Sequence, residues 1–262
     1  MSLNFTLPEE LNPYRERILQ TLRPFIRLLP QEEQESLPWA SRIGGLPYLP
    51  DGMPYPVAPD GQPLWLLAQV NFEEMPHLPP FPERGLLQFF ISDDNLYGLD
   101  LENPFDQSRF RVVYHPVIQR DEALLRSDFS FLGEAGFLPI EAGAAYPLKF
   151  ELSQELVPPS DYQFGQLLGE DLFDVFDGEK WEVLNRYSRA AIVSRHKVGG
   201  YAFFCQEDPR NPEDPMELLF QLGSSKEFNC MWGDMGVANF FICREALVRK
   251  DFSRVMYNWD CY

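Results

Sequence analysis

Short apolar runs bounded by turn residues recur along most of this chain and predict β-strands. Residues 64–70, 86–91 and 109–118 are apolar or alternate apolar with polar side chains, and proline, glycine and aspartate stand between them. Their length and their content of aromatic and β-branched residues favour strands over helices. Pro-Asp-Gly occurs twice between residues 50 and 63, which predicts tight turns because proline presets φ and glycine accepts a positive φ.

Two other stretches have helical patterns. Between residues 8 and 35, apolar side chains recur at helical spacing: Ile18, Leu22, Phe25, Ile26 and Leu29. Pro24 interrupts this helix and should kink it or split it into two turns. The second stretch contains residues 152–156, 164–168 and 178–187, and a Pro-Pro-Ser-Asp sequence at 158–161 supplies a break followed by an N-cap. We therefore expect an N-terminal helical segment at 1–35 and a helical connection at 151–189.

The strand-forming segments occur twice in the same order. The matching pairs are 41–45 with 196–200, 66–70 with 218–222, 85–91 with 236–242, and 111–114 with 254–257. The spacing is also kept, because Gln69 precedes Gly85 by 16 positions and Gln221 precedes Gly236 by 15. This pattern predicts an internal duplication, with a first β-rich repeat at 36–150 and a second at 190–262.

The two copies differ in one connection. Ile91 precedes Arg111 by 20 positions, whereas Ile242 precedes Arg254 by 12, so the first copy has an aspartate-rich insertion of eight residues. Each copy contains more large apolar residues than about a hundred positions can bury alone. We expect an α+β fold, predominantly antiparallel β with flanking helices, in which the duplicated units pack as one globular body about a pseudo-twofold axis. Two independent domains joined by the middle helices are the alternative.

The charge of the chain limits its partners. Forty acidic residues against 22 basic ones give a net charge of −18, while 45% hydrophobic residues supply a full core. Such a negative field repels nucleic-acid phosphates and anionic membranes, so neither is an expected partner. A basic protein or peptide would be attracted, although an acidic excess also simply keeps a protein soluble. Nothing in the sequence specifies an oligomeric state.

The cysteines and histidines give no sign of a metal site or a cofactor. None of the four cysteines forms a Cys-x-x-Cys pair, and the three histidines follow no zinc-binding spacing. The first residues lack the basic and apolar regions of an export signal, and no apolar run is long enough to span a membrane. We expect free thiols, no metal, no cofactor and a cytoplasmic location.

Polar residues at matching places in the two copies are the candidate binding residues. Gln69 and Gln221 are single amides within apolar runs, and each serves either a neighbouring loop or a cleft between the copies. The glycine pairs at 44–45 and 199–200 could hold a phosphate, but they lack a phosphate-loop motif and favour tight turns that let two backbones approach closely.

The most distinctive segment is Cys230-Met231-Trp232-Gly233-Asp234-Met235-Gly236. A cysteine–histidine pair with His196 would require a lowered thiol pKa and close contact. The first copy has Phe81, Glu83 and Gly85 at the corresponding places, so a ring, an acid and a glycine recur there without cysteine or histidine. We therefore interpret the segment as a turn, with Asp234 accepting backbone hydrogen bonds and Trp232 packing between the copies.

Several motifs together resemble the bacterial YwqG-like family. They are GGLPYLP at 44–50, LAQVNF at 67–72, GLLQFFI at 85–91, HKVGG at 196–200, QEDPR at 206–210 and MWGD at 231–234. The resemblance covers residues 36 to 262. It implies a mostly antiparallel β structure decorated with helices and no particular activity, because this family is a domain of unknown function. Some relatives resemble components of toxin-and-immunity gene neighbourhoods.

These observations favour a non-catalytic binding module with its site in the groove between the repeats. The ligand would be a peptide, a basic protein partner (as in an immunity protein that covers a basic toxin) or a small molecule. Six residues are predicted to bind it: Arg42, Gln69, Lys197, Gln221, Trp232 and Asp234. The alternative is a small-molecule enzyme that uses a carboxylate or cysteine of that groove, with Asp234, Glu83 or Cys230 as acid, base or nucleophile.

Overall fold

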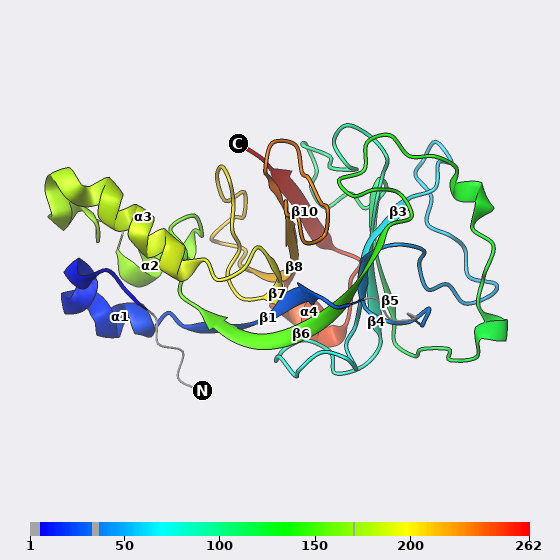
Figure 1. Cartoon of the computed structure of the whole chain (residues 1–262), viewed down its shortest axis with the longest axis horizontal. Helices are drawn as coiled ribbons and strands as arrows, with labels where there is room; N and C mark the ends of the chain where they lie inside the picture. The colour runs from blue at the N-terminus through cyan, green and yellow to red at the C-terminus, as the bar shows by residue number, and fades with distance from the viewer. Residues whose placement is uncertain (1–5, 33–36, 170) are drawn as a thin grey trace.

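All the strands belong to one antiparallel sheet. The computed structural model describes residues 6–32, 37–169 and 171–262. Its ten strands are ordered β10-β9-β8-β7-β1-β6-β2-β3-β4-β5 and curl into a nearly closed, barrel-like sheet (Figure 1). The fold is α+β, as the sequence predicts. Among the helices of the described residues, none combines the length and apolar character that crossing a bilayer requires.

The two outer groups of four strands are paired in the same way. The first group is β2 (Arg42–Gly44), β3 (Trp65–Asn71), β4 (Leu86–Ile91) and β5 (Phe110–His115). The second group is β7 (His196–Gly199), β8 (Met216–Gly223), β9 (Val237–Cys243) and β10 (Val255–Asp260). The pairing of β3 with β4 shifts register after Leu66, and that of β8 with β9 shifts after Leu218, so both groups have an irregularity at the matching position.

Two long strands join these groups at the centre of the sheet. They are β1 (Arg23–Pro30) and β6 (Ala145–Glu155). β1 pairs with β6 and with β7, and β6 also pairs with β2. Each group of four is therefore extended by the central strand that is more distant from it along the chain, which interlocks the two parts of the sequence.

The central strands correct the predicted helices. The segment expected to be helical at 8–35 is helical only in η1 (Glu9–Tyr14) and α1 (Arg15–Leu19), and its second half is β1. Residues 152–155 belong to β6 rather than to a helix, and Leu156 follows the end of that strand. Pairing of β1 with residues 148–155 of β6 explains both changes, and in β1 it leaves Phe25 and Ile26 fully buried. Residues 1–5 and 33–35 of the predicted N-terminal segment lie outside the described residues.

The remaining helices lie in the connections. The predicted helices at 164–168 and 178–187 correspond to α2 (Gln163–Leu168) and to η4 (Asp174–Glu179) followed by α3 (Lys180–Ala191). They gather with α1 at one end of the molecule (Figure 1) and share a separate apolar cluster. Short turns η2 (Glu122–Leu124) and η3 (Ser130–Leu132) interrupt the loop after β5, and α4 (Arg244–Arg249) connects β9 to β10.

The main core joins the two groups of strands. It contains buried residues from both groups and from β1 and β6. Phe89 on β4 stacks on Phe220 on β8, with ring centroids 4.6 Å apart, and lies 4.9 Å from the Phe240 ring on β9. The molecule is therefore built around a core that neither group completes alone.

Candidate functional site

The two predicted glutamines hold loops in place. Both are fully buried. Gln69 Oε1 accepts a hydrogen bond from the Tyr48 amide (3.0 Å), and its Nε2 donates to the carbonyls of Pro38 and Ala40. Gln88, opposite Gln69 on β4, donates from Nε2 to the Tyr48 carbonyl (2.8 Å). The amide pair thus fixes both backbone groups of Tyr48, which is a structural role.

The second group of strands repeats this arrangement with fewer bonds. Gln221 Oε1 accepts from the Phe203 amide (2.8 Å), and Asn239 Nδ2 on β9 donates to the Phe203 carbonyl (3.0 Å). Gln221 Nε2 and Asn239 Oδ1 are buried without a partner in the described structure. Asparagine is one methylene shorter than Gln88, so the amide–amide bond of the first group, from Gln88 Nε2 to Gln69 Oε1 (3.2 Å), has no counterpart here.

The two predicted cations are also buried. Lys197 on β7 is 1% exposed and donates to both oxygens of Glu155 on β6, at 2.7 and 2.6 Å. Arg42 on β2 is 7% exposed, donates to the carbonyls of Leu37 and Pro38, and lines a cavity of about 450 Å³. Burial lowers the Arg42 pKa to about 10. β1 and β6 lie between these two residues, so the fold does not bring them into one site.

The glycine pairs are tight turns, as the sequence favours. Gly44, Gly45, Gly199 and Gly200 all have positive φ. A Cβ atom on Gly44 would lie 2.3 Å from the Ala144 carbonyl oxygen, and one on Gly200 would lie 2.2 Å from Glu155 Oε1. Close approach of neighbouring groups therefore requires glycine at both places.

The cysteine–histidine pair considered from the sequence does not form. Cys230 is 2% exposed, and burial raises the pKa of its thiol to about 12. His196 Nδ1 accepts from the Gly223 amide, and its ring meets Phe228 edge to face. All four cysteines are free thiols, as expected.

Trp232 and Asp234 have different surroundings. Trp232 is fully buried and packs against Trp259 of β10 and against Tyr97, which belongs to the loop after β4. It thus lies between the two groups of strands, as predicted. Asp234 is exposed, and the hydrogen bonds of its turn run between backbone groups, from the Gly236 amide to the Trp232 carbonyl. The prediction that the Asp234 carboxylate accepts those bonds is wrong, because the backbone closes the turn by itself.

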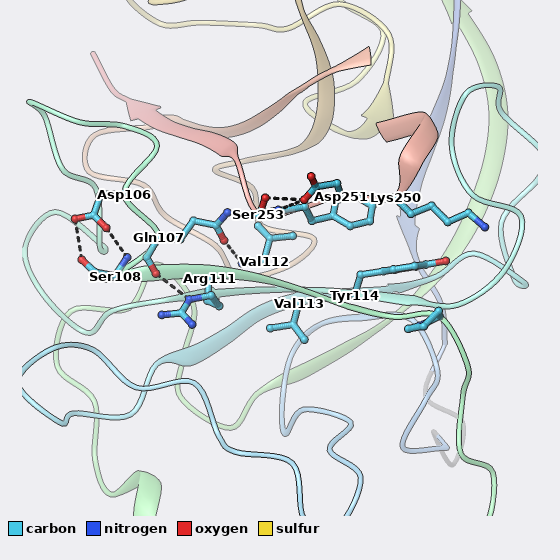
Figure 2. Close-up of a pocket in the computed structure, with 12 residues that line it drawn as sticks. Asp106, Gln107, Ser108, Arg111, Val112, Val113, Tyr114, Lys250, Asp251 and Ser253 are labelled. Atoms are coloured by element: carbon cyan, nitrogen blue, oxygen red, sulfur yellow. Dashed lines mark hydrogen bonds between the residues drawn. The ribbon is translucent and has the colours of Figure 1, made fainter. Parts of the chain in front are cut away.

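A groove of about 810 Å³ lies elsewhere, where the two groups of strands meet. Figure 2 shows β5 along one side and the turn at 250–253, between α4 and β10, along the other. The turn begins where Lys250 adopts a left-handed conformation and ends α4. None of the six residues predicted to bind a ligand is among those that line the groove: Asp106, Gln107, Ser108, Arg111, Val112, Val113, Tyr114, Pro116, Lys250, Asp251, Phe252 and Ser253.

Gln107 bridges the two sides of this groove. Its Oε1 accepts from the Val112 amide (2.8 Å) and its Nε2 donates to the Phe252 carbonyl (2.9 Å). The Tyr114 ring packs against Phe252, with centroids 5.1 Å apart, and its hydroxyl donates to the Arg84 carbonyl (2.8 Å). These contacts fix the width of the groove.

β5 is an edge strand whose backbone faces the groove. Because the Val112 amide points away from β4 to Gln107, and amide directions alternate along a strand, the Val112 carbonyl and both backbone groups of Tyr114 point the same way. In the described part of the chain the Tyr114 amide has no acceptor outside the sheet. Unpaired backbone groups of this kind form a template for another strand.

The opposite edge of the sheet, β10, is covered. The Tyr257 amide donates to the Pro104 carbonyl (2.8 Å), and Trp259 Nε1 donates to the Leu96 carbonyl (2.8 Å). Both acceptors belong to the aspartate-rich loop that is eight residues longer than the connection between β9 and β10. The shorter connection between β9 and β10 does not cover β5 in the same way, and the groove lies between them. This difference in loop length is the sequence signal that could have indicated the groove.

Comparison with known proteins identifies a family, and the description of that family names no activity. A search of curated proteins finds none that matches the chain. One family model matches residues 41–261, which span both groups of strands and the groove. The chain therefore belongs to the family described as a domain of unknown function, DUF1963.

Proposed function

We propose that this protein is a binding module that takes an extended peptide segment of a partner protein along β5. The observation that supports this is the difference between the two edges of the sheet, since the long loop covers β10 while the edge of β5 faces a groove of about 810 Å³. A peptide added to an exposed edge gains affinity from main-chain hydrogen bonds and specificity from its alternating side chains. The Val112 carbonyl and the Tyr114 backbone groups supply the pairing.

The net charge of the whole molecule favours a basic peptide segment. Asp106 and Asp251 line the groove, but each already accepts hydrogen bonds from its own turn, at Ser108 and Ser253 respectively. The cations Arg111 and Lys250 also line the groove and balance these two acids, so attraction of a basic segment rests on the net charge of −18, which acts at longer range. Such a field accelerates the approach of a positively charged partner and falls off with salt.

The enzyme alternative gains no support from this groove. Its described lining contains neither a cysteine nor a histidine. The hydrogen bonds from Ser253 hold the pKa of Asp251 below its usual range, which disfavours a role as general base near neutral pH.

The test begins with selection of binders from a random peptide display library. Selected peptides are then measured against Tyr114→Pro and Tyr114→Ala. Both variants lose the tyrosine ring, but only the proline variant lacks the outward amide, and edge strands tolerate proline. We expect the proline variant to bind at least about tenfold more weakly than the alanine variant.

Thermal unfolding of both variants provides the control for folding. Equal peptide affinity in the two variants would contradict strand addition at β5. So would an unchanged rate of hydrogen exchange at the Tyr114 amide of the wild type on adding peptide.

We also propose that the chain is YwqG-like and arose by duplication of a five-stranded unit. The supporting features are the matched registers, the matched glycine turns and the two amide pairs around Tyr48 and Phe203. Under this proposal β1–β5 and β6–β10 correspond, and each unit gives its first strand to the other.

A further inference from the structure

A second cavity, of about 400 Å³, gathers positive charge in this acidic protein. It lies between β1, the segment leading into β7 and the loop between β8 and β9. Its polar lining consists of three cationic side chains, three serines, one histidine and one acid: Arg27, Arg195, Lys226, Ser194, Ser224, Ser225, His196 and Glu227. A cavity of this volume falls within the range of small-molecule sites, roughly 300–1,000 Å³.

The three cations have no carboxylate partner in the described structure. The ion pairs of the described structure include none of Arg27, Arg195 and Lys226. Its buried ion pairs join Lys197 and Arg210 to buried acids. Glu227 lines the cavity and Glu151 lies opposite Arg27 on β6, but neither forms an ion pair with it. The guanidinium of Arg195 stacks 4.2 Å above the Phe203 ring, which fixes its plane and leaves its edge free to donate.

His196 supplies a neutral hydrogen-bond donor to the same cavity. Its Nδ1 accepts from the Gly223 amide (3.3 Å), so the proton of the neutral ring is on Nε2. Burial, together with the positive charges of Arg195 and Arg27, lowers the pKa of this histidine to about 4. Arg27 on β1, Arg195 just before β7 and Lys226 in the loop after β8 line the same cavity as this ring.

We propose that this cavity binds a small phosphate group, as inorganic phosphate or as a phosphate monoester, between Arg27, Arg195 and Lys226, with His196 Nε2 as a further donor. Arginine forks match phosphate oxygens in pairs, and a lysine adds a point charge. A dianion compensates the local excess of positive charge better than a single carboxylate. The net charge of −18 disfavours long polyanions such as nucleic acids and leaves a small anion as the fitting ligand.

The test follows the His196 ring by NMR while inorganic phosphate or glycerol phosphate is added at constant ionic strength. The chain has three histidines, and His196→Asn assigns the signal. We expect saturable shifts and a rise of the His196 pKa by about one unit, because a bound anion stabilises the imidazolium. Saturation by glycerol phosphate at lower concentration than inorganic phosphate would identify a monoester site, and the reverse order a site for free phosphate.

Two lysine variants provide a matched pair. Lys226→Gln removes one cation from this cavity, and Lys250→Gln removes the same charge from the β5 groove. We expect phosphate to bind about tenfold more weakly to Lys226→Gln and with unchanged affinity to Lys250→Gln. Equal weakening in both variants, or no saturable shift of His196 with either anion at millimolar concentration, would overturn the proposal.

Discussion

At the scale of single residues, matching positions in the two groups of strands have unequal energetic roles. Gln69 bonds to backbone groups of three residues, Pro38, Ala40 and Tyr48, whereas Gln221 bonds only to Phe203 and leaves its Nε2 unpartnered. Leucine has a similar volume, so replacement mainly removes hydrogen bonds and leaves buried backbone groups unsatisfied, at about 1–3 kcal/mol each.

We predict that Gln69→Leu lowers the free energy of unfolding by more than about 3 kcal/mol and Gln221→Leu by about 1–2 kcal/mol. Urea unfolding of the two variants under the same conditions measures the difference. Equal destabilisation would show that the bonds to Pro38 and Ala40 contribute little.

Two buried histidines make stability depend on pH. Burial lowers the pKa values of His115 and His196 from 6.5 to about 4. Between these values the unfolded chain binds more protons than the folded chain, so the free energy of unfolding falls as the pH drops through this window. Each histidine is expected to lower stability by about 2 kcal/mol between pH 7 and pH 5.

The double variant His115→Gln, His196→Asn tests this prediction. The replacements keep a polar atom near His115 Nε2, which contacts Gln88, and near His196 Nδ1, which accepts from Gly223. Urea unfolding at both pH values should show a smaller loss of stability in the double variant than in the wild type. An unchanged loss would assign the pH dependence to the carboxylates instead.

At the scale of elements, the sequence predicts strands where apolar runs are short and flanked by turns, and those predictions are confirmed for β3, β4 and β5. The sequence-based prediction is wrong at the centre of the sheet, where it expects helices in place of β1 and of the end of β6. Leu152 and Glu155 have good helix propensity, and the apolar residues before Pro30 happen to fall at helical spacing. Long-range pairing determines the outcome, since β1 pairs with residues 148–155 of β6 and also with β7, and no local pattern encodes partners more than a hundred residues away.

The candidate site is harder still to predict from sequence. Four of the residues that the sequence singles out are buried and have structural roles in loops and in the core: Gln69, Gln221, Lys197 and Trp232. The β5 groove depends instead on backbone groups and on the difference in length between two loops. Backbone hydrogen bonding leaves little trace in residue identity, so the sequence alone does not identify Tyr114 as part of a binding site.

At the scale of the whole molecule, the shared core makes one cooperative unit of the two groups of strands. The Phe89 ring contacts Phe220 and Phe240 across the interior, and the central strands are exchanged between the groups. Loss of either group would expose the apolar face of the other, so partial unfolding has no stable product.

We therefore predict a single unfolding transition, in which amides of β4 and β9 exchange with the same free energy of opening. Phe89→Ala leaves a cavity between the groups and should lower that value for both strands by about 3–5 kcal/mol. Val117→Ala, at a side chain that is 81% exposed, provides the control and should leave both unchanged. Native-state hydrogen exchange measures each strand separately. If Phe89→Ala destabilised β4 but not β9, the two groups would unfold as independent domains, and a groove between them could not hold a fixed width for a peptide.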